Sequence, residues 1–334
     1  MTPTYSLIVP TYNEEAVVPI LLHRLDALLD SLDAPAEVIF VDDGSKDATA
    51  IVLEGKARAD PRYRLLKLSR NFGHQIAITT GMDHAAGKAV IVMDADLQDP
   101  PEVVLDMIAK WKEGYEVVCG ERISREGEGR FKILTADLFY RLIGALSPTA
   151  VPPNVGDFRL VDRKALDCFL AMPERDRFVR GMFAWIGFRQ AVVKFERPGR
   201  AAGTSKYSLG RMIGLAATGL VSFSDAPLRL ALWSGAGVSA LALLYGLVVI
   251  GQWAAGDPSL MRGWSSTIVV IAFLGGANML MTGVIGLYVG RIHAEVKGRP
   301  LYIVEKAVGF DVERVVRSAA TERSMNAPVP FKRA

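Results

Sequence analysis

Two aspartates spaced two residues apart, Asp94 and Asp96, have the types and spacing to hold a divalent cation. They follow the apolar run AVIVM, which predicts a buried strand, and side chains two apart on an extended chain share a face. Hard cations such as Mg²⁺ prefer oxygen ligands and also bind substrate phosphates. Gln98 continues the same alternation. We therefore predict a metal site here, although Asp-x-Asp alone is more often a solvated turn.

Polar residues also follow three other strand-like runs. These polar segments are residues 10–12, 42–45 and 120–122. Because parallel strands present their carboxyl ends at one edge of a sheet, we predict that all four segments line a single cleft. No G-x-G-x-x-G motif follows a strand and no G-x-x-x-x-G-K-[ST] occurs, which disfavours ordinary dinucleotide and P-loop sites.

The elements that must position this cleft alternate between strand and helix patterns. Helices are predicted over residues 14–31 and 101–113, from apolar positions at helical spacing. The alternation predicts an α/β fold, a mostly parallel Rossmann-like sheet with helices on both faces. A further strand, LYIVEK at 301–306, is predicted to pair with another chain and so suggests a homo-oligomer. The remaining predicted strands are SLIVP, EVIFVDD, RLLKL, KAVIVMDAD and EVVCG.

The apolar residues are concentrated in two uncharged stretches, 230–256 and 263–290. Each exceeds the roughly 20 residues that a helix needs to cross a bilayer. We predict a transmembrane hairpin with spans at 227–254 and 264–290; the alternative is a pair of buried core helices. Basic residues flank the hairpin outside its connecting loop, so both termini are predicted to be cytoplasmic, at the inner membrane.

The rest of the chain divides around this hairpin. Residues 1–207 are predicted to form the cytoplasmic catalytic domain, since no signal peptide precedes them. Residues 208–226 have the pattern of an amphipathic helix lying in the membrane interface, or else of a packed helix of the soluble domain. Residues 291–334 are predicted to be a cytoplasmic tail with a disordered end. The net charge of +3, without a Lys/Arg tract, gives no indication of a nucleic-acid partner.

Several motifs together resemble family 2 glycosyltransferases of the GT-A fold. They are PTYNE at 10–14, VDDGSKD at 41–47 and DADLQDPPE at 94–102. The segments SRNFGHQIAITTGMDHAAG, VGDFRLVDR and RAAGTSKYS are similar to the polyisoprenyl-phosphate glycosyltransferases, such as dolichol-phosphate mannose synthase and the bactoprenol glucosyltransferases. The resemblance extends from about residue 5 to 306.

The resemblance implies a role for each matching residue. Asp94, Asp96 and Gln98 would hold Mg²⁺ or Mn²⁺ against a diphosphate. A departure is Thr204, which stands where relatives commonly have Glu, near the expected acceptor phosphate. The residues implied to bind the nucleotide are Pro10, Tyr12, Glu14, Asp42, Asp43 and Asp94, and those suited to the acceptor phosphate are Arg122, Arg200, Ser205 and Lys206.

Asp157, in the GDFR motif, is implied to be the catalytic base. A phosphate monoester has a second pKa of about 6 and is mostly dianionic at neutral pH, so it needs little activation. Asp157 would then orient the acceptor, or an arginine such as Arg159, instead of removing a proton. His74 begins the helix after the third strand; it could face the cleft, but we predict a structural role.

The implied reaction is inverting, metal-dependent transfer of a hexose, with UDP-glucose favoured, to undecaprenyl phosphate or another polyprenyl phosphate for cell-envelope glycosylation. A processive polysaccharide synthase is disfavoured because the chain has no Q-x-x-R-W motif and too few spans. A non-catalytic scaffold or a lipid-sugar translocation subunit would have no need of the DAD, GDFR and SKY segments together.

Overall fold

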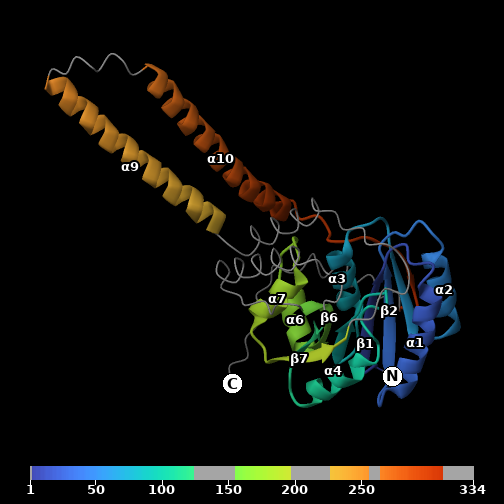
Figure 1. The fold of residues 1–334 in the computed structure, drawn as a ribbon. Coiled ribbons are helices and arrows are strands. Elements are labelled where there is room, and N and C mark those ends of the chain that lie inside the picture. The colour runs from blue at the N-terminus through green and yellow to red at the C-terminus, as the bar shows by residue number, and fades with distance from the viewer. Residues whose placement is uncertain (1, 124–154, 197–225, 256–263, 311–334) are drawn as a thin grey trace. The chain divides into compact units, whose positions relative to one another are not determined.

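The computed structural model describes residues 2–123, 155–196, 226–255 and 264–310. The chain forms two compact units, which are considered separately. The first contains a mixed sheet with flanking helices and the second contains two long helices (Figure 1). The predicted helix at 208–226 lies almost wholly outside the described residues.

The first unit is built on an eight-stranded sheet of order β7-β5-β6-β4-β1-β2-β3-β8. β6 and β8 run antiparallel to their neighbours and the other strand pairs are parallel. The mostly parallel sheet predicted from the sequence is therefore confirmed. The strands are β1 (Tyr5–Thr11), β2 (Ala36–Asp42), β3 (Tyr63–Leu68), β4 (Ala89–Val92), β5 (Val117–Arg122), β6 (Val155–Asp162), β7 (Gln190–Phe195) and β8 (Val304–Val308).

Helices cover both faces of this sheet. One hydrophobic core packs α1, α2 and α4 against alternate residues of the central strands, including Leu7 and Val9. The intervening residue Ile8 faces α3 on the other side, where α6 and α7 also pack. The helices are α1 (Val18–Ser31), α2 (Thr49–Ala59), α3 (His74–His84), α4 (Val103–Lys112), α6 (Arg163–Leu170) and α7 (Val179–Ile186).

The chain turns earlier than predicted after β4. The strand ends at Val92, and the residues that follow form turns in which Leu97 has φ of 58°. The prediction that Asp94, Asp96 and Gln98 alternate along an extended strand is therefore wrong. The physical reason is local: the Asp96 carboxylate accepts the backbone N–H of Gln98 at 3.1 Å, a pairing that competes with strand hydrogen bonding.

The segment predicted to pair with another chain pairs instead within its own sheet. β8 runs antiparallel to β3 and forms an edge strand. Lys67 pairs with Glu305 at 3.0 Å and Lys306 with Glu54 at 2.7 Å, so charges on both sides of the strand favour this position. The sheet of the first unit thus includes residues beyond the long helices, in a region predicted to be a tail.

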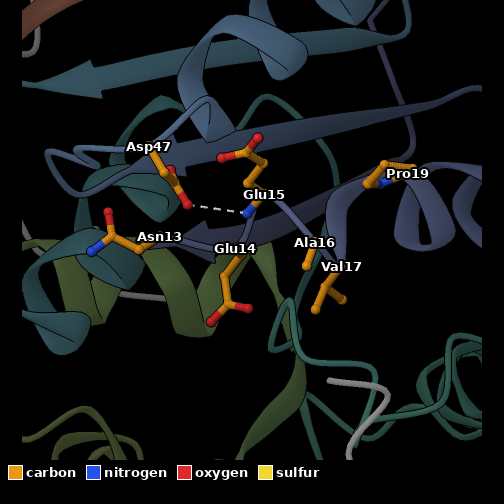
Figure 2. A pocket seen from close by; sticks show the side chains of 7 residues that line it. All are labelled: Asn13, Glu14, Glu15, Ala16, Val17, Pro19 and Asp47. Atoms are coloured by element: carbon orange, nitrogen blue, oxygen red, sulfur yellow. Dashed lines mark hydrogen bonds between the residues drawn. The ribbon is translucent and has the colours of Figure 1, made fainter. Parts of the chain in front are cut away.

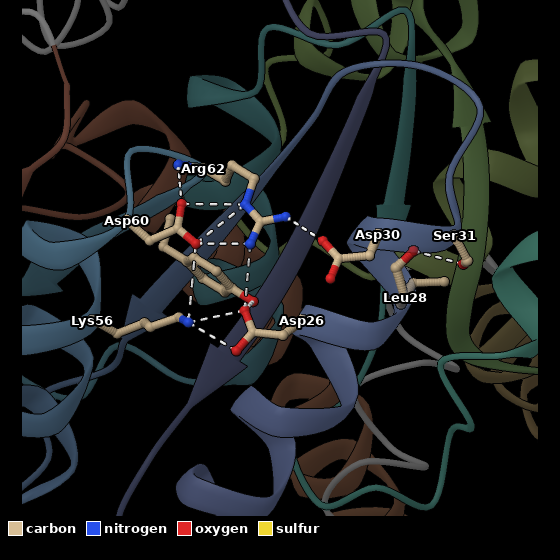
Figure 3. A network of polar contacts seen from close by, with 8 residues as sticks. Asp26, Leu28, Asp30, Ser31, Lys56, Asp60 and Arg62 are labelled. Atoms are coloured by element: carbon tan, nitrogen blue, oxygen red, sulfur yellow. Dashed lines mark hydrogen bonds and ion pairs between the residues drawn. The ribbon is translucent and has the colours of Figure 1, made fainter.

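A polar network links α1, α2 and the start of β3 on the surface (Figure 3). Lys56 pairs with Asp26 at 2.9 Å, and Arg62 pairs with Asp60 at 2.9 Å and with Asp30 at 2.8 Å. Asp30 is 70% exposed, and exposed pairs of this kind contribute about 0–1 kcal/mol. The network therefore joins α1 and α2 on the surface, and its residues are not among those predicted to line the cleft.

The described residues of the second unit include α9 (Ala226–Ala254) and α10 (Trp264–Val296), which contact one another. Among the described residues, one helical segment is long and apolar enough to cross a membrane, Phe273–Val296, with a mean hydropathy of 1.4. Its large apolar side chains are exposed, Met279 at 79% and Val296 at 78%. A two-helix transmembrane hairpin stays a prediction.

A close helix–strand contact leads to a test of the fold. A Cβ at Gly81 of α3 would lie 2.2 Å from Ile8 Cγ2, whereas a Cβ at Gly55 of α2 would meet no atom of the described part of the chain within 4 Å. Gly81→Ala should lower the free energy of unfolding by about 1–3 kcal/mol through overpacking. Gly55→Ala should raise it by about 0.5–1 kcal/mol, because alanine is the better helix former. Thermal unfolding of the full chain in detergent would show both shifts, and equal stability of the two variants would contradict this packing.

Candidate active site

The candidate site lies at the edge where β1, β2, β4 and β5 end and β6 begins. Val92 of β4 is opposite Arg159, and Glu121 of β5 is opposite Val155. Because β6 is antiparallel, its first residues lie beside the last residues of its neighbours. Asp157 therefore reaches the same edge as Asp94, as the single-cleft prediction requires.

Asp157 is 5% exposed and surrounded by hydrogen-bond donors. Arg180 binds it in a bidentate manner, Nε to Oδ1 at 2.8 Å and Nη2 to Oδ2 at 3.0 Å. Gln75 Nε2 donates to Oδ2 at 3.0 Å, and Arg159 Nη2 lies 3.9 Å from Oδ1. Burial alone would raise the pKa of Asp157, but the hydrogen bond from His74 and the charge of Arg180 hold it well below its usual range. A carboxylate held in this way is a weak proton acceptor.

His74 lies beside Asp94 and Asp157 at this edge of the sheet, and the structural role predicted for it stays a prediction. Its Nε2 is 3.5 Å from Asp94 Oδ1 and 3.4 Å from Asp157 Oδ2, and the side chain is 45% exposed. Burial lowers the pKa of His74, but the hydrogen bond to Asp157 and the charges of Asp94 and Asp157 outweigh it and raise the pKa to about 9. The sequence signal was the segment SRNFGHQIAITTGMDHAAG, which contains His74. In the structure Gly73, with φ of 100°, is the N-cap residue of α3 and precedes His74 directly.

The raised pKa of His74 gives a pH-dependent contribution to stability. Between the ordinary value of 6.5 and about 9, the folded chain binds this proton more tightly than the unfolded chain. The contribution is thus fully present below 6.5 and is lost as pH rises through 9. We expect the unfolding midpoint of the metal-free protein to fall over this window, and to fall less in His74→Gln. Parallel pH profiles for the two proteins, in EDTA, would contradict the assignment.

The predicted metal ligands lie on the turn after β4. Asp94 is 29% exposed, and its N–H donates to Asp99 Oδ2 at 3.3 Å. Asp99 is 1% exposed, and its Oδ1 has no hydrogen-bond partner among the described residues, with Arg122 Nη2 at 3.9 Å. Burial raises the pKa of Asp94, and raises that of Asp99 to about 7. Sequence reasoning missed Asp99, although it stands within the same acidic segment.

This turn fits a hard divalent cation by the chemistry of its donors. Asp94, Asp96 and Gln98 offer carboxylate and amide oxygens only. Across the described residues, no group of three or more His, Cys, Asp or Glu side chains could hold a metal ion. Mg²⁺ sites in nucleotide-dependent enzymes commonly use one or two carboxylates, with the remaining ligands from phosphate and water. Two carboxylates and an amide match that pattern.

Two of the residues predicted to bind the nucleotide have clear positioning contacts. The Asp43 carboxylate accepts the N–H groups of Phe72 at 2.7 Å and Gly73 at 2.9 Å, which fixes the loop before α3. Asp42 is fully buried and accepts the N–H of Ser45 at 3.2 Å. Burial raises the pKa of both carboxyl groups. A direct contact of either residue with a nucleotide stays a prediction.

A hollow of about 510 Å³ lies beside the end of β1 (Figure 2). Glu14 lines it, and the N–H of Glu15 donates to Asp47 at 3.3 Å across its rim. Tyr12, after the same strand, is 38% exposed, and Pro10 is buried within the strand. The remaining lining residues are Asn13, Ala16, Val17 and Pro19.

The predicted acceptor-binding residues are only partly described. Arg122 lies at the end of β5 with its side chain 27% exposed, and a Cβ at Gly156 would lie 3.0 Å from its Nη2. Gly156 therefore leaves space for the Arg122 side chain beside Asp157. Arg200, Ser205 and Lys206 lie outside the described residues, so their role stays a prediction.

Comparison with known proteins yields consistent matches. Residues 6–170 match glycosyl transferase family 2. The chain is 47% identical to an uncharacterized glycosyltransferase of Bacillus subtilis, YkcC, covering 94% of this chain and 97% of that protein. It is 40% identical to the SfII prophage-derived bactoprenol glucosyl transferase of Shigella flexneri, covering 90% and 97%. Among solved structures, glucosyl-3-phosphoglycerate synthase from Mycobacterium tuberculosis in complex with Mn²⁺, UDP and glucosyl-3-phosphoglycerate gives a TM-score of 0.47 at 20% identity, covering 66% and 79%.

Proposed function

Because this chain belongs to glycosyl transferase family 2, we propose that it transfers glucose from UDP-glucose to a polyprenyl phosphate such as undecaprenyl phosphate. The observation that carries the proposal is the similarity to bactoprenol glucosyl transferases over nearly the whole length of both chains. The mixed sheet with flanking helices fits the GT-A fold. The product would be a polyprenyl-phosphate sugar that serves cell-envelope glycosylation.

The arrangement of charges in the cleft suits two anionic substrates. Asp94, Asp96 and Gln98 would hold Mg²⁺ or Mn²⁺, which when bound offsets the charge of the donor diphosphate. Arg122 and Arg180, 27% and 31% exposed, supply cations beside the buried Asp157. Arginine binds phosphate oxygens in a bidentate manner. Arg200, Ser205 and Lys206 would add contacts to the acceptor phosphate.

The acceptor phosphate is the proposed nucleophile, in a single displacement in which one of its oxygens bonds to the anomeric carbon, the bond from that carbon to the diphosphate oxygen breaks, UDP leaves and the anomeric carbon is inverted. A phosphate monoester with a second pKa of about 6 is mostly dianionic at neutral pH and attacks without loss of a proton. The low pKa of Asp157 also makes it a poor base. Asp157 therefore orients Arg180 in this proposal. Of the two roles considered from the sequence, orientation is the one that the contacts favour.

The lipid acceptor gives the second unit a role in the proposed reaction. α10 presents exposed apolar side chains, and α9 has no charged residue after Arg229. Two helices of this composition would anchor the chain as a multi-pass protein of the inner membrane. The catalytic domain, predicted over residues 1–207 and extended by β8, and both termini would lie in the cytoplasm. The amphipathic 208–226 segment would then lie where the catalytic unit meets lipid, and the 291–334 segment would return to the cytoplasm.

Transfer of label into lipid tests the function directly. Membranes containing the protein would be incubated with radiolabelled UDP-glucose, undecaprenyl phosphate and Mg²⁺, and the lipid phase extracted. We expect one label per lipid, and a loss of about 100-fold or more in EDTA, restored by Mg²⁺ or Mn²⁺. Label entering only from another nucleotide sugar would change the donor assignment. No metal-dependent label from any donor would favour a scaffold or translocation subunit, and a polymeric product a processive synthase.

A further inference from the structure

We propose that Gln75 is a positioning residue for the transfer reaction: its side chain joins Asp157 to the first residue of α7 and thereby keeps Arg180 aligned with Asp157. The contacts that carry this proposal lie within the first unit. The reaction in which the residue would act rests on the proposed function. Gln75 lies in the segment SRNFGHQIAITTGMDHAAG, but neither that resemblance nor the spacing of acidic residues assigned it a role.

Gln75 uses both ends of its amide. Nε2 donates to Asp157 Oδ2 at 3.0 Å, and Oε1 accepts the backbone N–H of Val179 at 3.0 Å. These partners are 82 and 104 residues away in the sequence. One side chain near the start of α3 therefore ties together the beginning of β6 and the beginning of α7.

The N-cap residue of α7 supplies no side-chain acceptor for the first N–H groups of the helix, so an acceptor from another element takes that place. Phe178 at the N-cap position makes no side-chain capping hydrogen bond. The first N–H groups of a helix have no partner within the helix, and a side-chain oxygen normally satisfies one of them. Gln75 Oε1 supplies this acceptor from a different element. It thus fixes the end of α7 that carries Arg180, the residue after Val179.

The same amide also restricts the Asp157 carboxylate. Oδ2 accepts from both Gln75 Nε2 and Arg180 Nη2, while Oδ1 accepts from Arg180 Nε. The orientation of the carboxylate plane and the place of the guanidinium are therefore set together. A displacement of about 1 Å at a reacting centre can cost about 100-fold in rate, and loss of a supporting hydrogen bond about 10- to 100-fold.

The test replaces Gln75 with methionine, which has similar length and neither amide hydrogen bond. Gln190→Met is the matched control, because Gln190 Nε2 also donates to α7, to the carbonyl of Phe183 at 3.2 Å, on its later turn. We expect Gln75→Met to lower kcat by about 10- to 100-fold with the KM for UDP-glucose changed by less than about threefold. Gln190→Met should keep the wild-type kcat.

A double-mutant cycle separates positioning from a general effect on folding. If Gln75 acts through Asp157, Gln75→Met should lower the remaining activity of Asp157→Ala by less than about threefold. The effects of the two substitutions on kcat would then be far from additive. The same cycle measured by thermal unfolding in EDTA should also be non-additive. An equal loss in both backgrounds, or a Gln75→Met enzyme as active as Gln190→Met, would overturn the proposal.

The outcome is distinguishable from failure of the proposed function. If the wild type and Gln190→Met transfer no label, the reaction assignment fails, and the unfolding cycle still measures the Gln75–Asp157 contact. An additive unfolding cycle would then overturn that contact. If the wild type transfers label but the double-mutant cycle measured by activity is additive, the proposed function stands and the positioning role of Gln75 is wrong.

Discussion

Replacing Asp157 with asparagine is expected to lower sugar transfer by about 100-fold or more and to destabilise the protein by about 3–5 kcal/mol. The carboxylate is 5% exposed and pairs with Arg180 in a bidentate manner at 2.8 and 3.0 Å. Arg159, 2% exposed, lies 3.9 Å away. Loss of the negative charge leaves the buried Arg159 cation without compensation and releases Arg180 from its position. Label transfer and thermal unfolding would measure the two effects.

Asp167→Asn is the matched control, because Asp167 is 63% exposed and lies 3.7 Å from Arg163 on the surface of α6. It should change stability by less than about 1 kcal/mol and leave transfer unchanged. The pH dependence gives a further check. The folded pKa of Asp157 lies below its ordinary 3.8, so its stabilising contribution is present above 3.8 and is lost as pH falls further. Near-normal turnover of Asp157→Asn would show that neither a base nor an orienting carboxylate is needed there.

The second large effect is expected at Asp96. Asp96→Asn removes a predicted metal ligand but keeps a side-chain oxygen that can accept the Gln98 N–H, now at 3.1 Å, so the turn should persist. A cation that stabilises charge in the transition state contributes several kcal/mol, and each 1.36 kcal/mol is about tenfold in rate. We therefore expect a loss of about 100-fold or more in kcat, with activity that saturates only at higher Mg²⁺ or Mn²⁺ concentrations.

The control for Asp96 is Asp30→Asn, which also removes one carboxylate. Asp30 belongs to the surface network with Arg62 and is 70% exposed (Figure 3). It should change neither kcat nor the metal concentration needed for half-maximal activity. If Asp96→Asn transferred label with wild-type metal dependence, the cation would have to bind elsewhere. Thermal unfolding in EDTA should be similar for wild type and both variants.

Several elements of the fold could be read from local sequence patterns. The runs that form β1 and β2 are buried almost throughout, and such runs are typical of strands covered on both faces. α1 follows its apolar periodicity, although it begins at Val18 and not at Glu14, after a turn in which the N–H groups of Val17 and Val18 donate to the Glu14 carbonyl. The turn after β4 was missed, since it depends on hydrogen bonds made by Asp96 and Asp99 side chains.

By itself, the sequence determined the family, the alternation of strands and helices, and the acidic segments that follow the strands. The pattern of strands and helices is a local property, because burial of an element on one or both faces sets the spacing of apolar residues along the chain. Only the tertiary structure decided which groups meet. Which strands are neighbours depends on pairing between segments that are far apart in the sequence. The start of the antiparallel β6 lies beside the end of β4, and β8 pairs with β3. For the same reason Gln75, His74 and Arg180 converge on Asp157, although α3, α7 and β6, which carry them, are far apart in the sequence.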